Sequence, residues 1–200
     1  MDSPSPVRGL VIRYGEHVCP SGDTISEHAK VLRARGEFLF GKFGGAVAKS
    51  RLDQLRAQVS VGTPTFVYLA KRVGGKNRIH RANLVDIPET LTANHKPLIP
   101  AYYRDDVSRV SLWLCCDSLE LDEEAIRHLL VESSQSPLAE ALGASMSPKF
   151  NVIWSKEPVA GSGRVTTRRR SEAARYAGEV PTLEPEDFGR PGDDGLGDYE

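Results

Sequence analysis

The chain has 200 residues, of which 40% are hydrophobic, and its 26 lysines and arginines nearly balance 27 acidic residues, for a formal charge of −1. This length accommodates one domain of ordinary size with a tail, and the near-neutral charge excludes the overall basic excess of a general nucleic-acid-coating protein. The three cysteines, Cys19, Cys115 and Cys116, exclude an even disulfide framework and favour a reduced, intracellular protein.

The first residues lack the apolar stretch of a signal peptide. No later segment approaches the roughly 20 apolar residues of a membrane span. We therefore expect a soluble cytoplasmic protein with no membrane partner.

The first elements alternate between strand and helix. Residues 8–14 form a short run of apolar and aromatic residues that predicts a buried strand. Thr24 and Glu27 have capping-box spacing, and apolar residues recur at helical intervals after them, which predicts a helix over about 24–35. Gly36 is expected to end this helix.

A second strand is expected at about 37–43, followed by a helix at about 50–59 that Ser50 and Asp53 would open as another capping box. The next two runs, 65–72 and 77–87, flank Gly74-Gly75 and predict a β-hairpin with a tight turn.

Residues 88–109 contain three prolines and are expected to be irregular. They precede a predicted strand at about 110–117, a helix capped by Asp122 whose apolar stripe extends to Leu130, and a last strand at 150–154. The composition then changes to Gly, Pro, Arg, Glu and Asp, which is typical of disorder. We therefore expect a globular domain over 1–154 and a disordered charged tail over 155–200.

The predicted hairpin is basic, with no acid among six cationic or titratable side chains within residues 71–81: Lys71, Arg72, Lys76, Arg78, His80 and Arg81. Such a hairpin is either a solvated turn or a surface that follows a phosphate backbone, in a contact that salt would weaken.

Bulky side chains occupy both faces of the predicted sheet, since Phe66 and Tyr68 alternate with Val67 and Leu69. A sheet of this kind is covered on both sides or closed into a small barrel. Aromatic residues inside a barrel can be plain core, or they can stack on a nucleobase. The candidates for such stacking are Phe38, Phe40, Tyr68 and Trp113.

The loop at 97–104 holds two prolines, the paired Tyr102 and Tyr103, and an arginine. It can edge a binding site, which makes both tyrosines candidate ligand contacts, or it can be a proline-ordered connection.

Catalytic and metal-binding patterns are absent from the sequence. The five histidines show no metal-ligand spacing, and the C-x-x-C, H-E-x-x-H and P-loop patterns do not occur. His28 is interpreted as a hydrogen-bonded structural residue. We therefore expect a non-catalytic protein with no metal and no cofactor.

The succession of strand, helix, Gly-aromatic strand, helix, basic hairpin, Ile-Pro-x-Tyr-Tyr loop and Trp-bearing strand, over roughly residues 8–154, resembles the PUA-like superfamily, which includes the EVE, ASCH and YTH domains. The resemblance implies an α+β fold, a small mixed β-barrel with about three flanking helices, and binding of DNA or RNA. EVE and YTH members hold a modified base in an aromatic cage. Carried to this chain, the resemblance makes Phe38, Phe40, Tyr68 and Trp113 the cage and Lys42, Arg78, His80 and Arg81 the phosphate contacts.

Two functions remain open at this point. The first is a non-catalytic nucleic-acid-binding module that reads a modified base. The second is a protein–protein adaptor that binds its partner through residues 155–200, where a net charge of about +4 over 164–176 stands beside about −7 over 177–200.

Overall fold

The computed structural model describes residues 6–159 of the chain. The strands are β1 (Arg8–Arg13), β2 (Phe38–Phe43), β3 (Phe66–Val73), β4 (Lys76–Asp86), β5 (Val110–Cys116), β6 (Glu120–Leu121), β7 (Leu129–Val131) and β8 (Lys149–Trp154). The α-helices are α1 (Thr24–Arg35), α2 (Lys49–Ser60) and α3 (Leu138–Ala144), and the 3-10 segments are η1 (Ala93–Leu98), η2 (Ala101–Tyr103), η3 (Val107–Arg109) and η4 (Ala125–Arg127).

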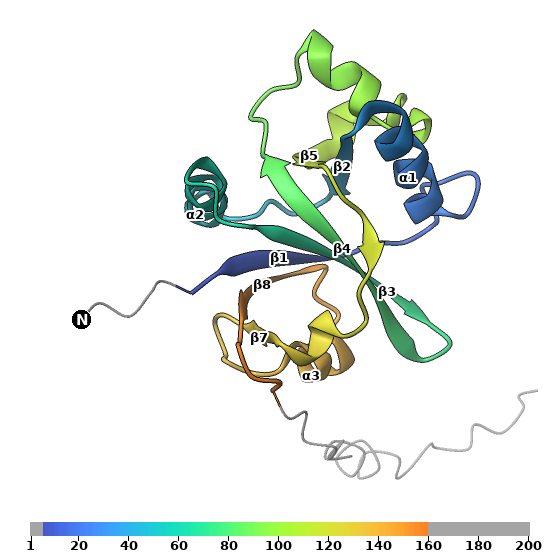
Figure 1. Ribbon diagram of the computed structural model, residues 1–200. Helices are drawn as coiled ribbons and strands as arrows, with labels where there is room; N and C mark the ends of the chain where they lie inside the picture. Colours follow the sequence, from blue (N-terminus) through green and yellow to red (C-terminus); the bar gives the residue numbers. More distant parts are fainter. Residues whose placement is uncertain (1–5, 160–200) are drawn as a thin grey trace, which may run out of the picture. The chain divides into compact units, whose positions relative to one another are not determined.

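The strands form one mixed sheet in the order β2-β5-β4-β3-β1-β8-β7, with β6 beside β4. The β1–β3 pair is parallel and the others are antiparallel. The long strand β4 pairs with β3 along most of its length and then, across an irregularity between Leu84 and Asp86, with β5, so that it joins two parts of the sheet (Figure 1). The end strands β2 and β7 do not pair with each other, so the sheet is open and the closed barrel is not confirmed.

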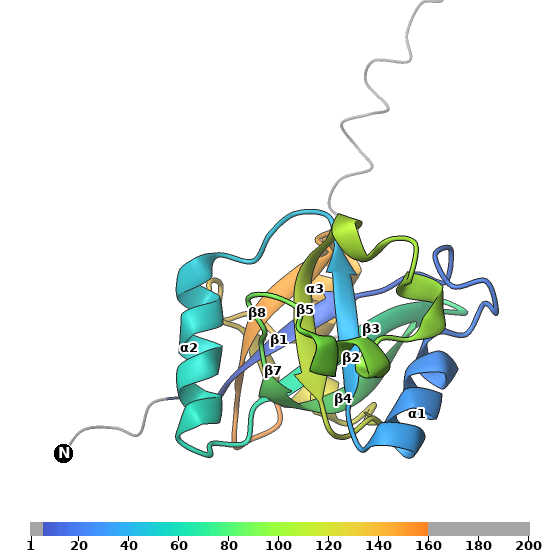
Figure 2. The same ribbon diagram turned by 90° about the horizontal axis from the view of Figure 1, so that it is seen from above.

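The α+β class is confirmed, and in both views α1 and α2 flank the β2–β5 pair, one on the right and one on the left (Figure 2). The tail expected at 155–200 lies, apart from residues 155–159, outside the described residues.

Helix α1 has the predicted bounds but a different cap. Asp23 is the N-cap, and its Oδ1 accepts a hydrogen bond from the Ser26 backbone N–H at 2.9 Å. Thr24 instead donates from its backbone N–H and its hydroxyl to one Glu16 carboxylate oxygen, at 2.7 and 2.5 Å. Gly36 ends the helix in the left-handed conformation, with φ of 80°, as the sequence predicts.

Helix α2 is present where the sequence predicts it, but its capping box is wrong. Ala48 is the N-cap, and no side chain caps the helix. Asp53 lies further along the helix and pairs with Lys49 at 2.9 Å and with Arg56 at 3.2 Å. These are exposed helix-surface pairs, which contribute little to stability.

The helix expected from Asp122 to Leu130 is wrong. Asp122 does accept a hydrogen bond from the Ala125 N–H at 3.0 Å, but only the 3-10 turn η4 follows, and the chain then enters strand β7. Leu129 and Val131 are buried while Leu130 between them is less so, because β7 pairs with β8 and turns alternate side chains inward. Pairing with a strand distant in the sequence has overridden the local helical pattern.

The sheet is covered on both sides, which is one of the two arrangements that its alternation allows. Val67 and Leu69 of β3 belong to one hydrophobic cluster with α1, α2 and the inner face of β2 and β5, which we call the helix-side cluster. Phe66, Tyr68 and Ala70 face a second cluster with β7, β8 and α3, the β8-side cluster. A third group, the η-side cluster, lies on the other face of β2 and β5 beneath η1, η2 and η3.

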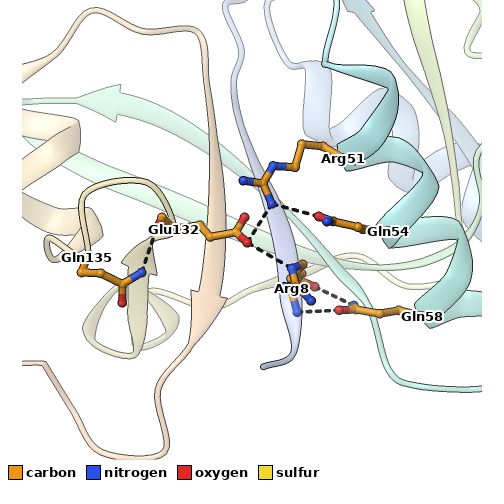
Figure 3. Close-up of polar contacts among 6 residues, drawn as sticks. All are labelled: Arg8, Arg51, Gln54, Gln58, Glu132 and Gln135. Carbon is orange, nitrogen blue, oxygen red and sulfur yellow. Dashed lines mark hydrogen bonds and ion pairs between the residues drawn. The ribbon is translucent and has the colours of Figure 1, made fainter. Parts of the chain in front are cut away.

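A polar network joins β1, α2 and the turn after β7 (Figure 3). One Glu132 oxygen, Oε1, accepts hydrogen bonds from Arg8 at 3.1 Å and from Arg51 at 2.7 Å. The Gln58 side chain binds the backbone N–H and C=O of Arg8, at 2.8 and 3.0 Å. Glu132 is only 15% exposed, so these charge-assisted bonds are partly screened from water and hold the three elements together.

Candidate functional site

The four rings proposed as a cage lie in different parts of the core. Phe38 and Phe40 are in the helix-side cluster, Tyr68 is in the β8-side cluster, and Trp113 is in the η-side cluster. Trp113 faces away from Leu112 and Leu114, as its position in the strand predicts, and therefore away from both phenylalanines. The structure does not bring these four rings together around one cavity.

A cavity with aromatic walls lies where the ends of β1 and β2 meet η2, and we call it the Tyr102 pocket. Its volume is about 160 Å³. Four of its walls are the rings of Phe40, Phe43, Tyr102 and Tyr103. It therefore contains Phe40 and both tyrosines of the loop among the candidate ligand contacts, and omits Phe38, Tyr68 and Trp113.

Tyr103 positions the tyrosine pair against the edge strand β2. Its hydroxyl donates to the Gly41 carbonyl oxygen at 2.8 Å and accepts from the Gly41 N–H at 3.2 Å. A Cβ at residue 41 would lie 2.8 Å from the Trp113 ring and 2.9 Å from the Tyr103 ring, so only glycine allows both rings to approach. Tyr102 then lies on Tyr103 with ring centroids 4.2 Å apart.

The buried hydroxyl of Tyr102 interacts with that of Tyr103, but within residues 6–159 it makes no hydrogen bond of normal geometry. Burial raises the pKa of Tyr102, which keeps the hydroxyl protonated and able to donate. A buried hydroxyl without a well-formed hydrogen bond costs free energy, which a ligand that accepts its proton would recover.

Two cations line the same pocket without a carboxylate partner in the described part of the chain: Lys42 and Arg13. Lys42 follows Phe38 and Phe40 on the inward face of β2 and is buried, with its Nζ donating to the carbonyls of Phe43 at 3.1 Å and Gly45 at 2.6 Å. Burial and the charge of Lys149 lower the pKa of Lys42.

Arg13 continues β1 past its apolar residues. Its Nη2 donates to the Leu142 carbonyl, its guanidinium lies over the Phe150 ring at 5.8 Å, and its Nε is buried without a partner. Burial and the nearby charge of Arg72 lower the pKa of Arg13. An anion near either side chain would offset its desolvation and its repulsion by the neighbouring cation, which is Arg72 for Arg13 and Lys149 for Lys42.

A second hollow, which we call the Arg72 hollow, shares Arg13, Tyr14 and Gly15 with the Tyr102 pocket. Its volume is about 300 Å³, and Lys71 and Arg72 of the β3–β4 hairpin also line it. The predicted hairpin is confirmed, and Gly74 and Gly75 form its turn with φ of 57° and 82°.

Carboxylates neutralise part of the basic hairpin. Lys71 pairs with Glu16 at 2.6 Å, and although burial opposes it, the hydrogen bonds from Lys71 and Thr24 lower the pKa of Glu16. Arg81 pairs with Glu120 and with Asp122 on the opposite side of the hairpin.

The remaining candidate phosphate contacts differ in exposure. Arg78 is exposed and has no ion pair within the described residues, and the same holds for Arg72 on the same hairpin, which is not one of the four candidates. His80 is half-buried, its Nδ1 is buried without a partner, and burial with the charge of Arg78 lowers its pKa. Of the four candidates only Lys42 reaches the Tyr102 pocket.

His28 is the buried centre of the neighbouring aromatic residues. Its ring lies 5.1 Å from Phe40 and 5.9 Å from both Tyr102 and Tyr103, and its Nδ1 donates to the Thr24 carbonyl at 2.8 Å. Burial lowers the pKa of His28 to about 4. The interpretation of His28 as a structural residue agrees with this environment.

Sequence reasoning missed Arg13, Tyr14 and Phe43 as pocket residues. A signal for Arg13 was present, since a charged residue directly follows the apolar run Leu10–Ile12 of a buried strand. Phe43 belongs to the aromatic strand that the sequence displays, but its ring lies beside Tyr103 with centroids 5.6 Å apart, and that contact joins residues 60 positions apart in the sequence.

The Tyr102 pocket presents groups that can contact a ligand. Rings, cations and a protonated hydroxyl suit a planar anionic ligand. Among residues 6–159 no group of three or more His, Cys, Asp or Glu side chains is placed to hold a metal ion, and burial raises the pKa of the Cys115 thiol to about 12.

Comparison of the chain with protein-family models, with curated proteins and with solved structures found no match. Within the described residues, no helix has both the length and the apolar character needed to cross a membrane.

Proposed function

We propose that this protein is a non-catalytic nucleic-acid-binding module of the PUA-like kind, and that the Tyr102 pocket receives a single base, plain or modified, of DNA or RNA. The observation that carries the proposal is the meeting of aromatic walls with two cations, the buried Lys42 and the partly buried Arg13, neither of which forms an ion pair with a described carboxylate.

Size and charge support this ligand class. A cavity of about 160 Å³ accommodates one ring system rather than a stack of bases. Base–aromatic stacking stabilises such a complex by about 1–3 kcal/mol for each base. Lys42 and Arg13 would offset phosphate charge. Arg72 extends the cationic surface toward the β3–β4 hairpin, along which the bound DNA or RNA strand can continue.

The bent mixed sheet is consistent with a PUA-like module, whose closed barrel remains part of this proposal. The alternative of a protein–protein adaptor depends on residues 155–200, nearly all of which lie outside the described residues.

The test is binding of the full chain to short labelled single-stranded DNA and RNA oligonucleotides, plain and with methylated or hydroxymethylated bases, at low and at physiological salt. Tyr102→Ala should weaken binding by roughly 5- to 150-fold, which corresponds to the loss of one stacked base. Arg72→Gln should weaken binding to all sequences. It should also reduce the slope of log affinity against log salt concentration by about one.

The matched control is Arg109→Gln, which removes an exposed arginine that lines neither the Tyr102 pocket nor the Arg72 hollow. It should bind like the natural chain. Absence of binding at low salt, or equal effects of Arg72→Gln and Arg109→Gln, would contradict the proposal.

A further inference from the structure

A second aromatic cavity, which we call the Trp154 pocket, lies on the β8-side face of the sheet. Its volume is about 240 Å³, and its aromatic walls are Phe66, Tyr68 and Trp154. It shares no lining residue with the Tyr102 pocket. Tyr68, which the sequence suggested as a ligand contact, belongs here.

The start of β1 determines the shape of this pocket. Gly9 pairs with Phe66 of β3, and a Cβ at residue 9 would lie 2.9 Å from the Phe66 carbonyl oxygen and 3.2 Å from the Tyr68 ring. Glycine therefore lets the Tyr68 ring lie directly against the backbone of β1. Gly9 therefore contributes to the pocket by letting the Tyr68 ring approach the β1 backbone, and not simply by leaving a side chain out.

Trp154 is a large apolar side chain exposed at the pocket, with 37% of its surface accessible. The His128 ring stacks on it with centroids 4.9 Å apart and an angle of 10° between the planes. His128 is itself held by a hydrogen bond between its Nδ1 and the Ser155 carbonyl at 3.2 Å. The indole is thus partly exposed yet held in one orientation.

The charges beside the pocket are already neutralised. Arg81 pairs with Glu120 and with Asp122, and its guanidinium lies over the Phe66 ring at 4.9 Å. Arg8 pairs with Glu132. Unlike the Tyr102 pocket, this pocket therefore offers no uncompensated cation to an anion.

A polar group without a partner remains in the wall. The Tyr68 hydroxyl makes no hydrogen bond to a residue of the part of the chain that the structure describes, and its oxygen is not one of the fully buried unpaired atoms, so it is open to water or to a ligand. Burial raises the pKa of Tyr68, so this hydroxyl stays protonated. It can donate to a ligand or accept from one.

We propose that the Trp154 pocket is a second binding site, for one neutral, planar aromatic ring that carries a hydrogen-bonding group such as a carboxamide. Aromatic walls select a flat ring, the paired arginines remove any preference for charge, and the Tyr68 hydroxyl binds the polar substituent. The volume suits a ligand of fragment size. This site does not depend on the function proposed for the Tyr102 pocket.

The first experiment titrates the full-length Trp113→Phe chain with nicotinamide and, as a charged match of the same shape, nicotinate. The chain has two tryptophans, so Trp154 is then the sole indole emitter. Nicotinamide should change the emission along a saturating curve, with nicotinate at least about tenfold weaker because its carboxylate loses hydration without gaining a cation. Linear quenching by both compounds, without saturation, would overturn the proposal.

Variants locate the binding. Tyr68→Phe should weaken nicotinamide binding about three- to tenfold by removing the hydrogen bond. Val7→Phe should abolish binding by filling the pocket from its rim, at a residue exposed enough to tolerate the larger ring. Tyr102→Ala should leave nicotinamide binding unchanged, so failure here is separable from failure of nucleic-acid binding.

Saturation-transfer NMR of nicotinamide on the natural chain gives the same answer if Trp113→Phe does not fold. Transfer that disappears in Val7→Phe supports the site. Transfer that persists in Val7→Phe and disappears in Tyr102→Ala would assign nicotinamide to the Tyr102 pocket and refute the proposal.

Discussion

His28 should make the stability of this protein fall as the solution becomes acidic. Burial lowers the pKa of His28 from 6.5 to about 4 in the folded chain. In the unfolded chain His28 titrates near 6.5. Between pH 6.5 and pH 4 the unfolded state binds a proton at His28 and the folded state does not. The contribution of His28 to the free energy of unfolding is therefore fully present above pH 6.5 and is lost as pH falls toward 4.

The magnitude follows from the two pKa values. Linkage of a single group with these values predicts that the free energy of unfolding falls by about 2.5 kcal/mol between pH 7.5 and pH 4.5. The assay is urea unfolding of the natural chain at several pH values across this range, compared with His28→Asn. The asparagine amide can still donate to the Thr24 carbonyl, which Nδ1 of His28 binds, but it does not titrate.

His28→Asn should be less stable at neutral pH, because it loses the contacts of the buried ring, and its stability should vary less with pH by about 2.5 kcal/mol. The exposed His17 supplies the matched control, and His17→Gln should keep the pH dependence of the natural chain. The reasoning is refuted if His28→Asn keeps it as well, or if NMR titration finds His28 protonating near pH 6.5 in the folded protein.

Two further variants test the packing that supports the two pockets. Glu132→Gln should lower the free energy of unfolding by roughly 1–3 kcal/mol, since it weakens two partly buried charge-assisted bonds. The control Glu124→Gln, which affects an exposed ion pair, should change the free energy of unfolding by about 0.5 kcal/mol or less. Equal effects of the two variants in chemical denaturation would contradict the stabilising role of the Glu132 network. Gly41→Ala should cost about 1–3 kcal/mol because its Cβ would overlap the Trp113 ring, while Gly45→Ala, which meets no atom within 4 Å, should be neutral or slightly stabilising. Equal melting temperatures for these two glycine variants would show that the rings do not constrain residue 41.

Local chemistry was enough to predict most of the elements. The turn at Gly74-Gly75 and the end of α1 at Gly36 depend on backbone conformations that glycine adopts at little cost, and a sequence displays such positions directly. Trp113 likewise faces away from Leu112 and Leu114 because side chains alternate along a strand, and this period is a local property.

Prediction from sequence failed where a contact with another segment of the chain overrides the local pattern. The stretch after Asp122 has a helical stripe, yet pairing with β8 makes Leu129–Val131 a strand. The capping residues of α1 differ from the prediction for a related reason, since Thr24 is bound by Glu16 from a preceding loop and Asp23 takes its place.

For function, the sequence by itself determined the materials: aromatic strands, a paired-tyrosine loop, a cationic hairpin and no catalytic pattern. Only the tertiary structure decided which of them meet. It separates Phe38, Tyr68 and Trp113 into three clusters, and it brings Phe40, Lys42 and Tyr102 together with Arg13 around one cavity. These contacts join β1, β2 and η2, and a contact between residues far apart in the chain depends on how the whole sheet bends, which no local pattern encodes.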